Sequence, residues 1–135
     1  MKLLLAFLLF SITAPKVVAC PNEIAQAPQK YKASPYEIRL LNAIHRHENS
    51  QHKGYCMAVL SPNYKGCKAQ VKRCLEIIRE TWLKWDGQGR KGSYIKKLGL
   101  RYCSPKYDFG GHYRWVRGVK YFMKKKGMYN GLIRN

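Results

Sequence analysis

The segment "KAQVKRCLEIIRETWLKW", residues 68–85, constrains the fold more than any other part of the chain. Its apolar residues recur at intervals of three and four, which places them on one face of an α-helix opposite lysine, arginine and glutamate. A helix of this kind is stable when other elements cover its apolar face. The residues of the apolar face are Val71, Cys74, Leu75, Ile78, Trp82 and Trp85.

A second helix is predicted to start at "SPYE". Ser34 is a good N-cap, Pro35 suits the first helical position, and Glu37 completes a capping box. The residues that follow form an apolar stripe at helical spacing, and one carboxyl falls on it. The members of this stripe are Ile38, Leu41, Ile44 and Glu48.

Two shorter helices follow later in the chain. Ser93 can cap one that runs to about Tyr102, and the other is expected from about His112 to Lys126, after a loop "CSPKYDFGG". Residues 50–67 lack helical periodicity, and "YCMAVL" predicts a short strand. We therefore expect a mainly α domain, all-α or α+β, with about four main helices. A short strand or hairpin is expected after the helix that starts at Ser34. The inward residues are predicted to be Tyr94, Ile95, Leu98, Trp115, Val119 and Phe122.

The first residues have the features of a signal peptide. A basic Lys2 precedes the apolar run "LLLAFLLFSI", and a small residue precedes Cys20. We expect residues 1–19 to be removed on export to the periplasm, the cell envelope or the extracellular space. Residues 20–33 contain two prolines and no periodicity, which predicts a flexible tether. Residues 34–135 then form a single domain.

The cysteines allow two interpretations of the mature N-terminus. "VVAC" resembles a lipobox, in which Cys20 carries a lipid and forms the only link to a membrane; the alternative is plain cleavage with Cys20 free or oxidised. With Cys20 set aside, an even number of cysteines is left, which predicts two disulfides in an oxidising compartment. Their pairing stays open among Cys56, Cys67, Cys74 and Cys103.

The chain is strongly basic. Its formal net charge is +19, or +17 without the leader, which carries Lys2 and Lys16 and no acid. Such a charge attracts polyanions. For an exported protein these are peptidoglycan, teichoic acids or lipopolysaccharide, and no motif for specific nucleic-acid recognition is present. We expect a monomer whose partners are anionic envelope polymers.

The chain has only seven acidic residues, and most have a predicted structural role. Glu48 and Asp108 lack one. A carboxyl on an apolar stripe is partly desolvated, which raises its pKa and allows it to donate a proton. Nearby cations such as Arg46 oppose this, and the alternative is that Glu48 is a surface acid ending a helix.

A metal or other cofactor is not expected. His45 and His47 are two residues apart and point to different sides of a helix, whereas zinc pairs on helices use i,i+4 spacing. The cysteines contain no CxxC pair. We predict a site without metal.

"AIHRHENS" resembles the catalytic helix of lysozyme-like glycan hydrolases, with the closest similarity to the glucosaminidase and lytic-transglycosylase branches. "GYCMAVLSP" and "YIKKLGLRYCSPKYDFGGHYRWVRGVKYF" are similar to the downstream segments of these enzymes, so the resemblance spans roughly residues 36–123. It implies a lysozyme-like fold, cleavage of the β-1,4 glycan strand of peptidoglycan, and Glu48 as general acid. Tyr102 matches a tyrosine that lies beside the cleaved sugar.

The chain departs from these families at several positions. "ENS" replaces the usual "ESG", the "GLMQ" signature is absent, and no acid lies between Glu48 and Glu76. Asp108 is a candidate second acid, or the N-acetyl group of the substrate attacks instead. The two-carboxylate scheme is not clearly met, and hydrolysis and transglycosylation both stay open.

Aromatic and polar side chains are the candidates for sugar binding. They are Tyr102, Tyr107, Trp115 and Asn49, with core packing as the favoured alternative for Trp115. Trp82 and Trp85 are predicted to belong to the core. The alternative function, from a different class, is a non-catalytic cationic secreted protein that binds the envelope or other polyanions.

Overall fold

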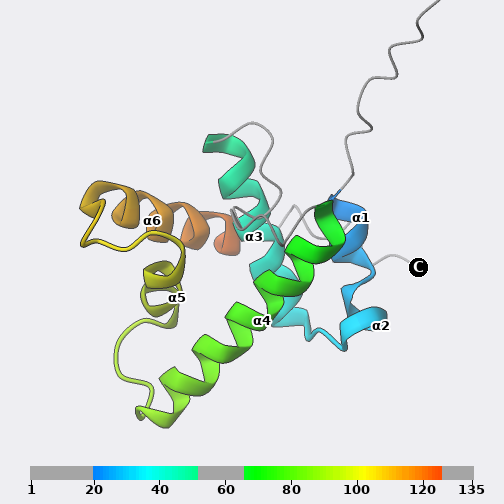
Figure 1. The fold of residues 1–135 in the computed structure, drawn as a ribbon, viewed down its shortest axis with the longest axis horizontal. Helices are drawn as coiled ribbons and strands as arrows, with labels where there is room; N and C mark the ends of the chain where they lie inside the picture. The colour runs from blue at the N-terminus through cyan, green and yellow to red at the C-terminus, as the bar shows by residue number, and fades with distance from the viewer. Residues whose placement is uncertain (1–19, 52–65, 126–135) are drawn as a thin grey trace, which may run out of the picture.

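The computed structural model describes residues 20–51 and 66–125, except the side chains of residues 49–51. This part of the chain contains helices and no strand, so the predicted mainly α fold with four main helices is confirmed. The predicted strand within residues 55–60 and the signal peptide within residues 1–19 lie outside the described residues. The helices are α1 (Cys20–Ala25), α2 (Ala27–Tyr31), α3 (Pro35–Gln51), α4 (Gly66–Gly87), α5 (Tyr94–Tyr102) and α6 (Phe109–Lys124) (Figure 1).

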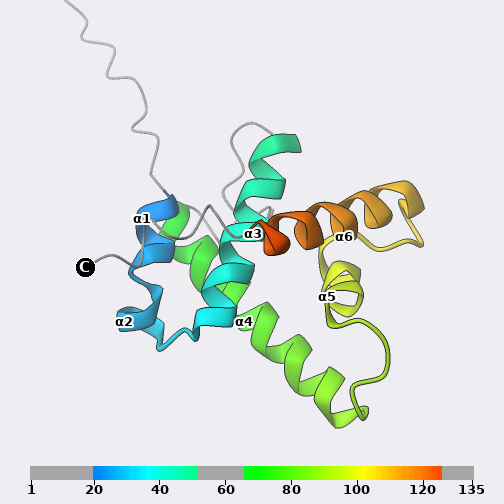
Figure 2. The ribbon, with the colours of Figure 1, turned by 180° about the vertical axis from the view of Figure 1, so that it is seen from behind.

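Helix α3 lies at the centre of the fold and contacts α1, α2, α4 and α6. Helices α1 and α2 lie on one side of α3, and α5 and α6 lie on the other, as both views show (Figures 1 and 2). Helix α5 bridges α4 and α6. The buried core therefore surrounds α3, with fully buried side chains at Leu40, Leu41, Ile44, Val71, Ile78, Leu98 and Val119.

The predicted start of α3 is confirmed. The Ser34 backbone N–H donates to Glu37 Oε2 at 2.7 Å, and the Glu37 N–H donates to Ser34 Oγ at 3.2 Å, which is a reciprocal capping box. Arg79 of α4 donates to the same carboxylate at 2.7 Å. The first turn of α3 is thus held by hydrogen bonds within the turn and by a hydrogen bond from α4.

The apolar stripe of α4 is confirmed except at its C-terminal end. Val71, Cys74, Leu75 and Ile78 are buried, but Trp82 is 37 % exposed, so its prediction as a core residue is wrong. The Trp82 ring packs on Trp85 and Tyr94 with centroids 5.2 Å from each, while its outer face stays in solvent. The C-terminal end of the α4 stripe therefore lies at the edge of the core, where it packs on aromatic rings and is partly exposed to solvent.

The flexible tether predicted for residues 20–33 is wrong, because these residues form α1 and α2. Ile24 and Ala27 are fully buried in the core. The Glu23 carboxylate of α1 accepts hydrogen bonds from Lys30 and Tyr31 of α2, and these bonds hold the two helices together. Pro28 occupies the first turn of α2, where a missing N–H costs no helical hydrogen bond.

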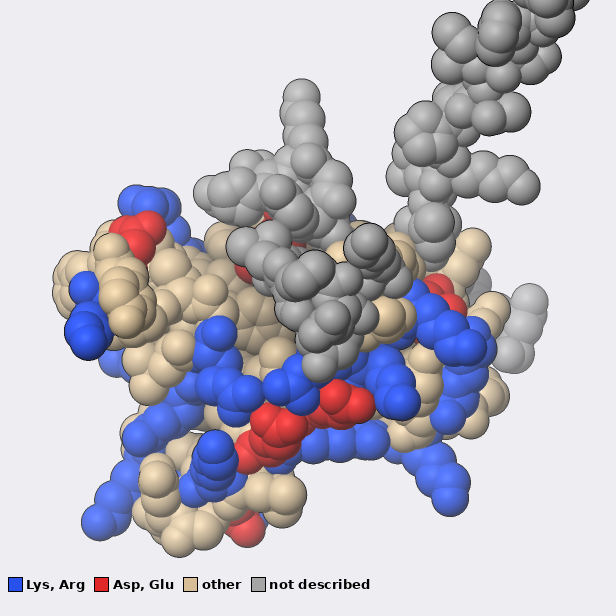
Figure 3. All heavy atoms as spheres, in the orientation of Figure 1, with Lys and Arg blue, Asp and Glu red and all other residues tan. Residues whose placement is uncertain are grey.

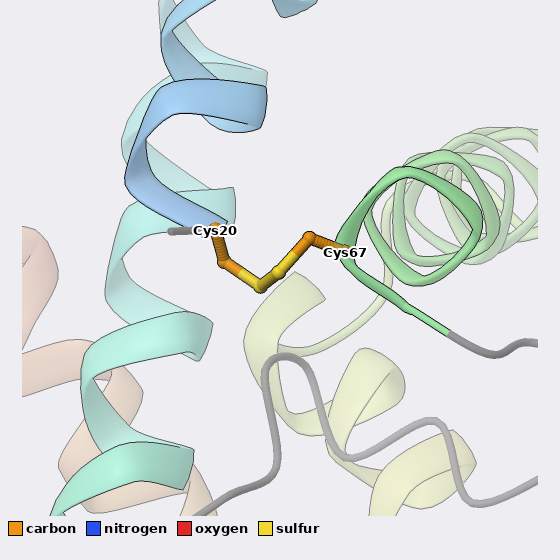
Figure 4. The surroundings of a disulfide bond; sticks show 2 residues. All are labelled: Cys20 and Cys67. Atoms are coloured by element: carbon orange, nitrogen blue, oxygen red, sulfur yellow. A yellow bond between two sulfur atoms is a disulfide. The ribbon is translucent and has the colours of Figure 1, made fainter. Parts of the chain in front are cut away.

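The prediction of two disulfides among the cysteines other than Cys20 is also wrong. Cys20 forms a disulfide with Cys67, which joins the first residue of α1 to the start of α4 across a sequence separation of 47 (Figure 4). A Cys20 sulfur in a disulfide has no place for a lipid, which contradicts the lipidated alternative. Cleavage before Cys20 stays a prediction. Cys74 and Cys103 are free thiols, and Cys56 lies outside the described residues.

None of the described helices is long and apolar enough to cross a membrane. Lysine and arginine side chains cover much of the surface seen in Figure 3, and the largest group of acidic atoms lies over α4. Glu76 and Glu80 of α4 pair there with Arg73, and Glu80 also pairs with Arg101. The predicted solvent side of α4 is therefore a network of ion pairs.

Candidate active site at the end of helix α3

Glu48 lies where the apolar stripe of α3 ends. Leu41 and Ile44, the preceding members of the stripe, are fully buried, and Glu48 is only 5 % exposed. The prediction that this carboxyl continues the apolar face is confirmed, and the alternative of a surface acid is wrong. Burying a carboxyl is costly unless it is hydrogen-bonded, so its partners matter.

Trp115 of α6 supplies a hydrogen bond to this carboxyl. Its indole Nε1–H donates to Glu48 Oε1 at 2.8 Å, and the Trp115 side chain is itself only 4 % exposed. This burial fits core packing and does not fit stacking on a sugar. We assign Trp115 the role of fixing the position of the Glu48 carboxyl.

Tyr102 extends this contact toward α4. Its ring stacks on Trp115 with centroids 4.9 Å apart and planes 17° apart, and its hydroxyl is hydrogen-bonded to Cys74 Sγ at 2.7 Å. Burial raises the pKa of Cys74 to about 12 and holds the pKa of Tyr102 well above its ordinary value. When Glu48 is ionised, its charge raises both pKa values further, which places the three groups in one electrostatic neighbourhood.

His47 and Gly118 also belong to this site, although the sequence analysis assigned neither to it. His47 is buried and its ring meets the edge of Trp115, with centroids 6.3 Å apart. A Cβ added at Gly118 would overlap the His47 ring, so α3 and α6 approach each other at a position that only glycine allows. The spacing of Leu40, Ile44 and His47 is the helical signal that could have identified His47.

Two other predicted site residues, Tyr107 and Asp108, are not part of this cluster. Tyr107 lies in the α5–α6 connection and is 84 % exposed, with the Lys106 ammonium 5.5 Å from its ring centroid. Asp108 is the N-cap of α6 and accepts from the Gly111 N–H at 2.7 Å. Helix α6 begins three residues before the predicted start, and this boundary error hid the capping role of Asp108. The side chain of Asn49 lies outside the described part of the structure.

Glu48 differs from every other acidic residue of the chain in its burial. The described residues include all seven acids, and Glu48 is the only one of them that is buried. The other six acids are half-buried or exposed. Those six are Glu23, Glu37, Glu76, Glu80, Asp86 and Asp108.

Within residues 20–51 and 66–125, no group of three or more histidine, cysteine or acidic side chains is placed to hold a metal ion. The described cluster instead offers one carboxyl, held by an indole N–H and surrounded by aromatic and sulfur-containing side chains. Such an arrangement can exchange a proton with a bound substrate.

Comparison of the chain with protein-family models, curated proteins and solved structures finds no match.

Proposed function

We propose that the protein is an exported enzyme that cleaves the β-1,4 glycan strand of peptidoglycan, with Glu48 as the general acid. The observation that carries this proposal is that Glu48 is the single buried acid of the chain, 5 % exposed at the end of α3. The lysozyme-like resemblance assigns the acid to this same residue at the end of its helix. The four main helices support that fold class.

The chemistry requires a carboxylic acid that is protonated before the bond breaks. Burial disfavours the charged form of a carboxyl, and the Trp115 N–H orients the group without adding a positive charge. Glu48 then donates its proton to the glycosidic oxygen as the bond from that oxygen to the anomeric carbon breaks. The leaving sugar departs as an alcohol, and Glu48 becomes a carboxylate.

The second half of the reaction needs a nucleophile at the anomeric carbon. Asp108 is an exposed helix cap paired with Arg114 at 3.9 Å, which makes it a weak candidate for this role. We therefore assign the attack to the carbonyl oxygen of the substrate's own N-acetyl group, a route that needs no second carboxylate. Water, or the C6 hydroxyl of the same sugar, then opens the cyclic intermediate and returns a proton to Glu48.

Charge and compartment are consistent with this substrate. The net charge of +17 without the leader favours an anionic envelope, where a single chain would be held close to its glycan. The Cys20–Cys67 disulfide is consistent with an oxidising compartment outside the cytoplasm. No cofactor is required by the proposed chemistry.

The test compares Glu48→Gln with the unchanged protein and with Glu76→Gln on purified peptidoglycan. Glutamine keeps the shape and the carbonyl oxygen that accepts from Trp115, but it has no proton to give. Glu76→Gln is the matched control, because its side chain is 45 % exposed on α4. We expect Glu48→Gln to release soluble muropeptides roughly 100- to 10,000-fold more slowly, and Glu76→Gln to match the unchanged protein.

Two further readouts complete this test. Mass analysis of the released fragments identifies the reaction, because hydrolysis leaves reducing ends and transglycosylation leaves 1,6-anhydro ends. Peptidoglycan that is bound by all three proteins without any soluble product would contradict the enzyme and favour the non-catalytic cationic protein.

A further inference from the structure

Helix α6 has a second face that the proposed active site does not use. Trp115 and Tyr113 are two residues apart, and residues at this spacing point to nearly opposite sides of a helix. Trp115 is directed at Glu48, whereas Tyr113 is 61 % exposed. Tyr113, Arg117 and Lys120 follow one another at spacings of four and three and therefore share the outer face.

This outer face forms one wall of a groove of about 660 Å³ between α6 and α5. Lys96 of α5 and Pro105 of the α5–α6 connection contribute to its lining. No acidic side chain lines it. The chemically distinctive residues of the α6 wall are Phe109, Tyr113, Arg117, Lys120 and Lys124, which we call the α6 groove residues.

The aromatic members of the groove are open to a ligand. Phe109 is 75 % exposed, and neither its ring nor that of Tyr113 packs on another ring within the described part of the chain. Exposed aromatic side chains of this size usually mark a contact surface. Tyr121, which also lines the groove, holds the Lys125 ammonium 4.9 Å from its ring centroid.

The basic members of the groove are also open to a ligand. Lys96, Arg117, Lys120 and Lys124 form no ion pair among the described residues, whereas arginines elsewhere, such as Arg73 and Arg79, are paired with acids. Four such cations around one groove set up a positive potential that a polyanion would neutralise. The cations around this mainly apolar groove therefore favour a ligand that has both anionic groups and apolar surface.

We propose that the α6 groove is a second binding site, separate from Glu48, for an anionic sugar polymer. Aromatic rings stack on the apolar faces of pyranose rings, and the surrounding cations pair with carboxylate or phosphate groups along the polymer. A groove suits a linear chain better than the flat surface of a bilayer. The choice of a sugar polymer rests on the proposed function, but the groove and its charge do not.

The test uses full-length mature protein carrying Glu48→Gln, so that no substrate is consumed. The probe is polygalacturonate, a carboxylated pyranose polymer, and dextran is the neutral polymer. Three variants are compared in this background. The charge variant combines Arg117→Gln, Lys120→Gln and Lys124→Gln; the aromatic variant combines Phe109→Ala and Tyr113→Ala; and the matched control removes the same charge elsewhere through Lys72→Gln, Lys84→Gln and Lys91→Gln, which are all exposed.

We expect the charge variant to bind polygalacturonate about tenfold more weakly and the matched control to change binding by less than about twofold. The aromatic variant, at unchanged net charge, should bind about three- to tenfold more weakly. Dextran should not bind measurably. Circular dichroism of each variant checks that the helices are intact.

Three results would overturn the proposal. Equal weakening by the charge variant and its matched control would mean that charge acts diffusely. Unchanged binding by the aromatic variant would remove the sugar contact. Binding to phosphatidylcholine–phosphatidylglycerol vesicles that depends on the groove, without such binding to polygalacturonate, would make this face a membrane surface. Each result leaves the Glu48 assay unaffected, so this proposal and the proposed function can fail separately.

Discussion

Helix α3 carries a glutamate near each end, and the two have opposite surroundings. Glu37, in the first turn, accepts hydrogen bonds from the Ser34 backbone and from the Arg79 guanidinium at 2.7 Å. Glu48, in the last turns, is more deeply buried and accepts from the neutral indole of Trp115 at 2.8 Å. One carboxyl faces a cation and the other faces an aromatic ring.

This difference distinguishes a structural acid, Glu37, from the acid that we propose to be the proton donor, Glu48. Burial alone would raise the pKa of Glu37, but the hydrogen bonds from Arg79 and Ser34 outweigh it and lower that pKa. Glu37 is therefore held as a carboxylate that ties α3 to α4. The Trp115 N–H satisfies one oxygen of Glu48, and the burial of Glu48 disfavours the charged form of a carboxyl, as the proposed proton donor requires. Two residues of the same type on one helix thus differ in burial and in their hydrogen-bond donors.

The largest effect on stability is expected where α3 and α6 approach each other beside Glu48. Gly118→Ala places a methyl group where it overlaps the buried His47 ring, so α3 and α6 must shift apart or the ring must turn. We expect a loss of about 3 kcal/mol in the free energy of unfolding, measured by urea denaturation. Activity should fall as well, because His47 precedes Glu48.

The control for this substitution is Gly87→Ala at the end of α4, where an added Cβ meets nothing within 4 Å. Alanine there should leave the stability unchanged or raise it slightly. Equal stability of the two alanine variants would mean that α3 and α6 do not pack through Gly118.

A smaller effect is expected from removing the donor to Glu48. Trp115→Phe keeps an aromatic ring beside Tyr102 but loses the indole N–H that bonds Glu48 Oε1. We expect a loss of about 2 kcal/mol in unfolding free energy, because a buried carboxyl loses a partner and the core loses ring volume. Muropeptide release should fall with it.

A double-mutant cycle separates these two contributions. In the Glu48→Leu background, Trp115→Phe should cost less, since no carboxyl is left to lose a donor. The same cost in both backgrounds would show that Trp115 acts through packing alone.

The smallest effect is the pH dependence that Glu37 confers. Its pKa in the folded state lies below the ordinary value of 4.5, so its contribution is present above that value and is lost as the pH falls through the folded-state pKa. Glu37→Gln should therefore lower the melting temperature at neutral pH, and the difference should shrink as the solution is acidified. A difference that stays constant down to strongly acidic pH would contradict the ion pair with Arg79.

The local signals of the sequence predicted the helices well. The capping box at Ser34 and Glu37 and the stripe of α4 depend on residues within a few turns, so spacing alone identified them. The helices at residues 20–31 were missed because five- and six-residue helices have too few turns to show periodicity, and their stability comes from burying Ile24 and from the disulfide of Cys20.

The candidate site was predicted only in part, because local spacing does not show contacts between residues that are distant in the sequence. The spacing of α3 indicated that Glu48 is buried, but its partner Trp115 is 67 residues away in the sequence. Cys74 was predicted to be in a disulfide because cysteine counting cannot show that its thiol meets the Tyr102 hydroxyl. The roles of Trp115 and Cys74 depend on contacts between helices that are distant in the sequence. Such contacts cannot be predicted from the spacing of residues in a single sequence.

The most direct test measures Glu48→Gln and Glu37→Gln side by side, for muropeptide release from peptidoglycan and for thermal unfolding. We predict that Glu48→Gln loses roughly 100- to 10,000-fold in release while its melting temperature stays within about 2 °C of the unchanged protein. Glu37→Gln should do the reverse, with release per folded molecule unchanged within about twofold and a melting temperature lower by about 4 °C. Normal release by a folded Glu48→Gln protein would contradict the account.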